Sequence, residues 1–364
     1  LVATGVLNVV LIKWADKLIA TGSAGNSHFF EHPFLQTALL FFSELLCLFI
    51  YKIAYALLKR RQNGSEERFI LTAGNRDFHP TVFFLPAVLD VIASSMLFIG
   101  IFLTYGSSFQ IIQGLVVIFT GIFRSSFLNV PLKIQHWIGM MTIVTAVVLV
   151  GLSDFLSHYL AHGNNARAVI TGDLFIGCAQ IFKGIQIVYE ERYVKVLNIA
   201  PLHAVGWEGV FGFIITFVSL IPLSYLKAFP PFNKNSHAAF EDVFDAFSQV
   251  EDNYVLLILH AVFVVSVGFY YFAGMSISKI LSASHFCAFD CIRTIVIFFI
   301  SMKFEWERFY YLQLISLSLL FCGVLIYNNL VFVNCYRWIV MKCLRRTSSD
   351  TSADDILIQP ADAI

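Results

Sequence analysis

The chain has 364 residues, of which 58% are apolar and 13% are charged, with 24 basic and 24 acidic side chains. Soluble globular domains usually contain about 45–50% apolar and about 25% charged residues. This composition excludes a soluble enzyme, a nucleic-acid binder and a disordered adaptor. Because a membrane-spanning helix takes about 20 mostly apolar residues, the chain can supply up to about ten spans.

Ten apolar segments follow one another along the chain. They are 1–18, 34–58, 81–103, 107–128, 134–152, 170–189, 205–226, 254–275, 281–302 and 309–333. They lack the alternation of barrel strands, and a helix satisfies its own backbone groups within lipid. The sequence therefore predicts an all-α integral membrane protein with ten transmembrane helices.

The basic residues predict how these helices are oriented. Fourteen lie in the even-numbered connections and the C-terminal tail, and seven lie in the odd-numbered connections. The positive-inside rule then places both termini in the cytosol. Asn63-Gly64-Ser65 is the only N-x-S/T sequon in the sequence. It falls on the cytosolic side, so we expect no N-linked glycan there.

The longest connection within the helical part, 227–253, contains a helical pattern of its own. Phe240, Val243, Phe244 and Phe247 recur at helical spacing and predict a short amphipathic helix at the lumenal membrane interface. The other side of that helix carries acidic residues, namely Glu241, Asp242, Asp245 and Glu251. Its role is either a substrate lid or a passive surface helix.

A division into two halves of five helices is suggested by the similar apolar strings Val116–Phe119 and Ile295–Phe298 in segments four and nine. Because five is odd, the second half has the inverted orientation, as in many transporters with a midplane substrate site. The expected parts are a first repeat at 1–152, a lumenal linker at 153–169, a second repeat at 170–333 and a cytosolic tail at 334–364.

One pair of opposite charges lies inside an apolar segment. Asp290 and Arg293 are three residues apart in segment nine, which places them on one helical face. A charge at the membrane centre costs about 2.5–3.5 kcal/mol on insertion scales, so such residues are expected to face the bundle interior. The pair is either purely structural, or Arg293 alternates between Asp290 and an anionic substrate, since its planar fork suits phosphate and carboxylate.

Two further segments carry polar side chains at helical spacing. Gln180, Lys183 and Gln186 form one stripe on segment six, which is either a solvated cavity wall or a helix–helix contact. Gln110 and Gln113 lie at the polar end of segment four, where they can hydrogen-bond a sugar or a base.

Three acidic residues stand alone within apolar segments, and the sequence lacks recognisable catalytic motifs. Glu44, Asp90 and Glu208 are candidates for proton coupling, or alternatively protonated or paired structural residues. We found no GxSxG, HExxH, Walker or GxGxxG motif, and no cysteine or histidine spacing typical of a metal site. We therefore expect no enzyme activity, no cofactor and no metal.

Several strings resemble solute carrier family 35, subfamily F, in the drug/metabolite transporter superfamily. They include Lys13-Trp14-Ala15-Asp16, His32-Pro33-Phe34-Leu35-Gln36, Ser107-Ser108-Phe109-Gln110, Ile170-Thr171-Gly172-Asp173-Leu174, Tyr189-Glu190-Glu191-Arg192, Phe272-Ala273-Gly274 and Leu281-Ser282-Ala283. The resemblance implies a nucleotide-sugar-transporter-like protein of the EamA-like fold, with ten helices in two inverted repeats and cytosolic termini. Relatives usually carry basic residues where this chain has Gln113 and Phe286.

These observations predict an endomembrane carrier of a small polar or anionic metabolite that works by alternating access. The alternative is a membrane adaptor or regulator that uses a carrier fold without transport. The predicted substrate-lining residues are Gln110, Gln113, Lys183, Lys279, Asp290 and Arg293. The expected partners are the substrate, the lipid bilayer and a second copy in a homodimer, and no nucleic acid.

The tail carries a short string that resembles an acidic dileucine sorting signal. It reads Asp354-Asp355-Ile356-Leu357-Ile358 in a polar and acidic stretch. It is either a binding site for sorting adaptors or ordinary disordered tail. The first reading favours the lysosomal or late endosomal membrane, with Golgi and mitochondrial membranes as alternatives.

Overall fold

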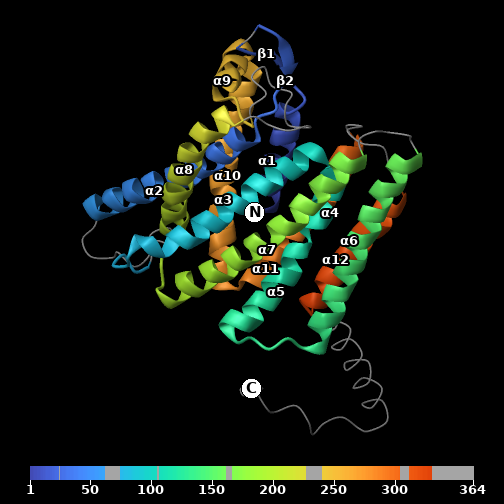
Figure 1. Cartoon of the computed structure of the whole chain (residues 1–364). Helices are drawn as coiled ribbons and strands as arrows, with labels where there is room; N and C mark the ends of the chain where they lie inside the picture. Colours follow the sequence, from blue (N-terminus) through green and yellow to red (C-terminus); the bar gives the residue numbers. More distant parts are fainter. Residues whose placement is uncertain are drawn as a thin grey trace, which may run out of the picture.

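The computed structural model describes residues 1–23, 25–61, 74–104, 106–160, 166–226, 240–303 and 311–329. The helices are α1 (Val2–Ala15), α2 (Pro33–Arg61), α3 (Phe84–Leu103), α4 (Gly106–Gln113), α5 (Leu115–Leu128), α6 (Ile134–Leu160), α7 (Ala166–Val196), α8 (Pro201–Tyr225), α9 (Val243–Asp252), α10 (Tyr254–Ile280), α11 (Ala283–Lys303) and α12 (Tyr311–Tyr327). A 3₁₀ turn, η2 (Pro80–Phe83), precedes α3, and β1 (Ile19–Thr21) and β2 (Ser27–Phe29) form a hairpin. Figure 1 shows the arrangement.

The prediction of an all-helical, multi-pass membrane protein is confirmed. Among the described residues, eight helical stretches are long and apolar enough to cross a membrane, and α1 and α12 are two shorter apolar helices. Each predicted segment contains a helix, but the one predicted at 107–128 is divided into α4 and α5 at Gly114. The predicted sequon at Asn63, the sorting string at 354–358 and part of the predicted loop, 227–239, lie outside the described residues.

Some helices are longer than their apolar segments. α7 begins at Ala166 and ends at Val196, whereas the apolar pattern predicts 170–189. Its last turns carry Glu190 and Glu191, which are buried despite their charge. Apolar length therefore underestimates this helix, because its last turns carry charged residues, some buried and some exposed such as Arg192, which an apolar pattern does not register.

The outer surface of the bundle is apolar. On α8, Ile214, Phe217, Val218 and Ile221 have 54% to 58% of their surface exposed. Soluble monomers rarely expose contiguous apolar patches of this kind, but a lipid-facing helix requires them. The interior of the bundle is apolar as well, with fully buried side chains such as Phe41, Ile111 and Leu320, so apolar residues occur on both the lipid-facing and the inward faces of the helices.

The helices pack in a few dominant pairs, which are α2 with α8, α3 with α7, α6 with α12, α5 with α7 and α1 with α10. The α2–α8 contact depends on glycines at three-residue spacing on α8. A Cβ atom at Gly206 would lie 2.6 Å from the Cβ of Leu48, and one at Gly209 would collide with the backbone nitrogen of Leu45. Small residues thus allow two membrane helices to approach closely.

A small cap, defined as residues 18–23, 25–32 and 240–252, projects from one end of the bundle (Figure 1). It contains the β1–β2 hairpin, in which Ala20 pairs with His28, and α9. Asp242 caps α9 by accepting a hydrogen bond from the Asp245 amide at 3.0 Å. We call the opposite end of the bundle the base; it contains the end of α5 at Leu128 and the end of α7 at Val196.

The predicted amphipathic helix is present as α9, and its acidic side is the buried one. Glu241 and Asp245 have no exposed surface, whereas Phe244 and Phe247 are 79% and 59% exposed. The acidic residues pack against the hairpin. Burial opposes a charge on His32, but its hydrogen bonds with Asp245 and Glu241 outweigh burial and raise the pKa of His32 to about 9. The buried carboxylates of the cap therefore hold His32 in its charged form.

Candidate functional site

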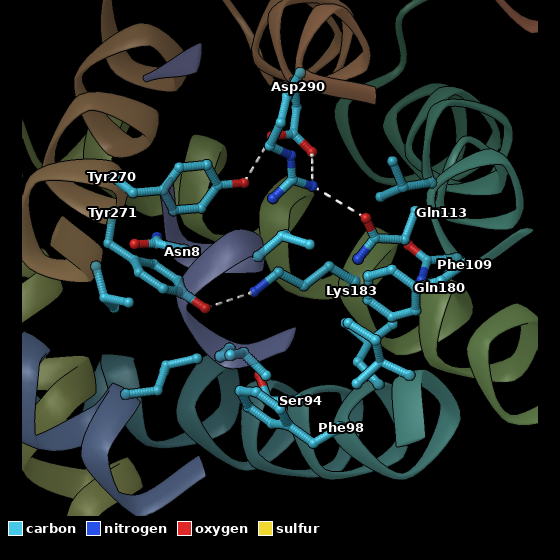
Figure 2. Close-up of a pocket in the computed structure, with 18 of the residues that line it drawn as sticks. Asn8, Ser94, Phe98, Phe109, Gln113, Gln180, Lys183, Tyr270, Tyr271 and Asp290 are labelled. Atoms are coloured by element: carbon cyan, nitrogen blue, oxygen red, sulfur yellow. Dashed lines mark hydrogen bonds and ion pairs between the residues drawn. The ribbon is translucent and has the colours of Figure 1, made fainter. Parts of the chain in front are cut away.

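A cavity of about 130 Å³ lies within the bundle, and its walls come from α1, α2, α3, α4, α5, α7, α10 and α11. Figure 2 shows side chains from these helices converging on it. The wall contains six aromatic rings, which are Phe98, Phe109, Phe263, Tyr270, Tyr271 and Phe286. An apolar wall with a few convergent polar groups is the usual composition of a small-molecule site.

Arg293 is the centre of the first polar arm of the cavity. Its Nη2 donates to Asp290 Oδ2 at 2.8 Å and to Gln113 Oε1 at 3.0 Å, and the Tyr270 hydroxyl donates to Asp290 Oδ1 at 2.9 Å (Figure 2). The i, i+3 pairing inferred from sequence is therefore formed. The guanidinium is shared between a carboxylate and a neutral amide, so its remaining N–H groups are left for another acceptor.

Lys183 is the centre of a second polar arm, on α7. Its Nζ lies 2.9 Å from Asp90 Oδ1 and 3.5 Å from the Tyr271 hydroxyl. Asp90 also accepts from Ser94 at 2.7 Å and from Gln186 at 2.9 Å. The predicted polar stripe on this helix is thus divided, since Lys183 lines the cavity while Gln186 is bound behind it.

The three predicted acidic residues gather behind the second arm. Gln186 Nε2 bridges two of them by donating to Asp90 at 2.9 Å and to Glu208 at 2.7 Å. Glu44 is fully buried, and neither of its carboxylate oxygens has a hydrogen-bond partner among the described residues. Glu190 is also buried on the same helix as Gln186. Lys183 is the cation that this cluster of carboxylates contacts in the described part of the chain.

Two polar atoms around the cavity are buried without a hydrogen-bond partner in the described structure. They are Arg293 Nε on α11 and Asn8 Oδ1 on α1. Buried polar groups are nearly always paired, so an unpaired donor and an unpaired acceptor on a cavity wall indicate room for a bound molecule. Asn8 lies near the middle of the first apolar helix, on the wall facing Lys183 (Figure 2).

The structure does not bring every predicted lining residue into the cavity. Gln113, Lys183, Asp290 and Arg293 line it, but Gln110 and Lys279 do not. Gln110 is fully buried, with both amide atoms lacking a partner among the described residues. The amine of Lys279 donates to the carbonyl of Ile199 at 2.8 Å, near the base.

Sequence reasoning did not single out Asn8, Tyr270 and Tyr271 as candidates. Asn8 has a signal in retrospect, because it is a single amide inside an apolar segment. The two tyrosines have none, since aromatic residues are 16% of the chain. Phe286 lines the cavity as Gln113 does, so both positions where the resemblance implies a lost basic residue face the same space.

A separate polar cluster holds the helices together at the base. Glu191 accepts from Arg124 Nε at 3.1 Å, from Lys195 Nζ at 2.8 Å and from the Ala283 amide at 3.1 Å. These groups come from α5, α7 and the start of α11. Glu191 is 1% exposed, so this cluster closes the bundle on the base side of the cavity.

Sequence comparison identifies the family of this chain. Residues 9–230 match the family model described as Solute carrier family 35 (SLC35F). Solute carrier family 35 member F6 of Homo sapiens is 38% identical over 331 residues, which cover 91% of this chain and 87% of the relative. The chain belongs to solute carrier family 35. It is a membrane protein of that family, and its relatives are carriers by name rather than enzymes.

More distant similarities extend over the same region. An uncharacterised protein of Schizosaccharomyces pombe is 26% identical over 331 residues, covering 91% of this chain and 96% of the relative. A solved crystal structure is 15% identical, covers 90% of this chain and 96% of its own, and has a TM-score of 0.53. At that identity the structural similarity shows the fold alone.

Proposed function

We propose that this protein is an endomembrane solute carrier that moves a small anionic or polar metabolite by alternating access through the cavity. The proposal rests on the surroundings of Arg293: its guanidinium is only partly paired and lies in a cavity lined by aromatic rings inside the membrane. Intramembrane ionisable residues usually mark a substrate or ion pathway.

The packing of the helices supports ten spans in two inverted repeats. In this proposal, each helix of the first repeat has a counterpart in the second: α1 corresponds to α7, α2 to α8, α3 to α10, α4–α5 to α11 and α6 to α12. If each helix is replaced by its counterpart in the other repeat, the α1–α10 contact becomes α7–α3, the α2–α10 contact becomes α8–α3, and the α1–α11 contact becomes α7–α5. All six of these contacts are present. The α2–α8 and α6–α12 contacts each join a helix to its own counterpart, so the same replacement leaves them unchanged. The lumenal linker predicted at 153–169 then joins the two repeats, and the cap side is lumenal by the distribution of basic residues.

The substrate class follows from the cavity wall. Arg293 offers N–H donors suited to a carboxylate or phosphate, and Lys183 adds a second positive charge on the facing helix. The aromatic rings of Tyr270, Phe109 and Phe286 suit an apolar or ring-shaped body. Nucleotide-sugar-like molecules and simpler anionic metabolites share this chemistry, with the anion at Arg293.

The acidic cluster behind Lys183 is the proposed site of proton coupling. Glu44, Asp90, Glu190 and Glu208 are buried close to one lysine. Carboxylates packed together in a low-dielectric site cannot all carry charge, so such a cluster takes up and releases protons as its cation moves. If a substrate anion draws Lys183 away from Asp90, the carboxylates left behind gain affinity for a proton.

Alternating access requires the two ends of the bundle to open in turn. The Glu191 cluster joins α5 of the first half to α7 and α11 of the second half at the base. We propose that it is the base-side gate and that it breaks when the cavity opens to the cytosol. Arg124 and Lys195 are 23% and 33% exposed, so water can replace their ion pairs with Glu191 when the gate opens.

Uptake into proteoliposomes tests the proposal. Purified protein is reconstituted and offered labelled carboxylates, monophosphates and nucleotide sugars, and we expect saturable uptake of at least one class. Arg293→Lys should lower that uptake at least about tenfold, because a point charge does not reproduce the forked contact. Arg192→Lys is the matched control, since Arg192 is exposed and donates to the Phe127 carbonyl at 3.2 Å. Absence of flux for every class would favour a non-transporting role.

The proposed location is the lysosomal or late endosomal membrane. Its support is the string Asp354–Ile358 in the C-terminal tail. Replacing Leu357 and Ile358 with Ala and imaging the full chain in cells tests it. We expect redistribution to other membranes, and an unchanged location would contradict the proposed signal.

A further inference from the structure

Two histidines and a carboxylate converge inside the cap, far from the membrane cavity. One ligand atom from each of His28, His32 and Asp245 lies within 4.8 Å of the others. We propose that these three side chains bind a single divalent transition-metal ion, with Zn²⁺ as the best match, and that the ion holds the hairpin to α9.

The orientation of both imidazole rings supports this site. His32 Nδ1 lies 2.7 Å from Glu241 Oε1, and His28 Nδ1 lies 3.2 Å from the Asn26 carbonyl. Because both partners accept, each Nδ1 carries a hydrogen, and each Nε2 is left to face Asp245. His28 Nε2 donates to Asp245 and His32 Nε2 donates to Gln249 Oε1 at 3.1 Å, so a bound metal ion would take the place of the two Nε2 hydrogens. A histidine that donates Nδ1–H to a carboxylate or carbonyl while Nε2 binds a metal is the common arrangement in zinc sites.

The spacing of the ligand atoms fits a tetrahedral ion. Zn²⁺ binds imidazole nitrogen and carboxylate oxygen at about 2.0–2.2 Å, which places tetrahedral ligands about 3.3 Å apart. His28 Nε2 is 2.7 Å and His32 Nε2 is 3.7 Å from Asp245 Oδ2, so the observed distances lie on either side of that value. The ligand atoms already lie within 4.8 Å of one another, and shifts of about half an ångström would bring the two contacts with Asp245 to about 3.3 Å.

The charges and the access route also fit. Glu241, Asp242 and Asp245 are buried carboxylates, so a dication that displaces the Nε2 protons of the two histidines still balances most of their charge. Two nitrogen ligands favour Zn²⁺ over Mg²⁺ or Ca²⁺, which prefer oxygen. His28 is 30% exposed, and a water on its open side would complete the coordination. The remaining oxygen of Asp245 accepts from the Ser23 amide at 2.8 Å, which fixes the carboxylate.

The consequence concerns the two halves of the bundle. His28 and His32 lie between α1 and α2, and Asp245 lies on α9, between α8 and α10. An ion bound by all three would link these two parts of the chain over more than 200 residues. It would brace the cap-side ends of α1 and α10, which both line the cavity.

The test measures the metal itself on the purified full-length chain. After treatment with a chelator, the protein is titrated with Zn²⁺, and we measure metal content per chain, dissociation constant and melting temperature. We expect one Zn²⁺ per chain and a higher melting temperature with Zn²⁺ than with chelator. Substitution with Co²⁺ should give the strong visible absorption of a tetrahedral ion.

The diagnostic variant is His28→Gln, because His28 is partly exposed and glutamine retains a hydrogen-bonding group. It should bind Zn²⁺ at least about tenfold more weakly while keeping the melting temperature of the metal-free wild type. His79→Gln is the control, since His79 is an exposed histidine outside the cap. Absence of bound Zn²⁺ in the wild type, or equal affinity in His28→Gln, would overturn the proposal. Neither readout depends on transport.

Discussion

The cavity and the cap each contain a buried acid–base pair, but the two pairs are built over very different sequence separations. Arg293 and Asp290 are one helical turn apart and lie 2.8 Å from each other. His32 and Glu241 are 209 residues apart and meet at 2.7 Å. The first pair is fixed by helical geometry alone, whereas the second exists only once the whole bundle has assembled.

This difference has a physical consequence for function. A pair within one helix can separate by side-chain rotation without moving the backbone, so Arg293 is free to exchange Asp290 for a ligand. The cap pair joins two chain segments, so breaking it removes one of the contacts that hold the hairpin side of the cap to the α9 side. We therefore assign exchange chemistry to the cavity and a bracing role to the cap, and the following experiments test that contrast.

The largest expected effect comes from breaking the cavity pair. Asp290→Ala and Arg293→Ala each leave a buried charge unpaired, which typically costs about 3–5 kcal/mol of folding free energy. The double variant removes both charges, so its thermal stability should recover most of that loss while uptake stays abolished. Thermal unfolding in detergent and proteoliposome uptake measure the two quantities. Full uptake by a well-folded double variant would remove both residues from the site.

Replacing either of two buried acidic residues with its amide tests which carboxylate stabilises the second polar arm, around Lys183. Asp90→Asn deprives Lys183 of its partner at 2.9 Å, and we expect a loss of about 3 kcal/mol in stability. Glu44→Gln removes no hydrogen bond, because neither oxygen of Glu44 has a partner in the described structure. Its stability should change by less than about 1 kcal/mol.

Transport by the Glu44→Gln variant then tests proton coupling. If Glu44 takes part, uptake should lose its dependence on an imposed pH gradient while the protein remains stable. Wild-type pH dependence in Glu44→Gln would restrict coupling to Asp90, Glu190 and Glu208. A loss of more than about 3 kcal/mol in stability would instead make Glu44 a structural residue.

A smaller effect is expected in the cap. Glu241→Gln weakens the contacts of the carboxylate with His32 Nδ1 and with the Phe34 amide at 2.9 Å, which should cost about 1–3 kcal/mol. The loss should be local, because the cap lies outside the cavity. Hydrogen exchange of residues 18–32 should rise while uptake changes little. Equal exchange in the variant and the wild type would show that other contacts hold the hairpin.

The smallest effect is expected at Asp252, on the surface of the cap. Its carboxylate accepts from the Thr21 amide at 2.8 Å, and this bond lowers the pKa of Asp252 below its usual value of 3.8. A lowered pKa stabilises the fold above pH 3.8 and ceases to do so as the pH falls through the lower value. Asp252→Asn should therefore slightly raise hydrogen exchange at Thr21 at neutral pH, and the difference should disappear in acid.

Local patterns predicted much of this molecule. The positions of the apolar helices, the existence of α9 and the pairing of Asp290 with Arg293 all follow from spacing over a few residues. Four of the six predicted lining residues, including Gln113 and Lys183, do line the cavity. Gln110 and Lys279 do not, because helical spacing gives the face of a residue on its helix but not which helix covers that face.

The sequence by itself determined that this protein is an apolar helical bundle and which charged residues must lie inside it, because burying charge in lipid is costly wherever the helices pack. Only the tertiary structure decided the partners of those charges. Lys183 binds Asp90 across 93 residues, and His28 and His32 meet Asp245 across more than 200. Such contacts depend on how whole helices approach each other, and close packing at glycines such as Gly206 sets that approach through shape rather than periodicity.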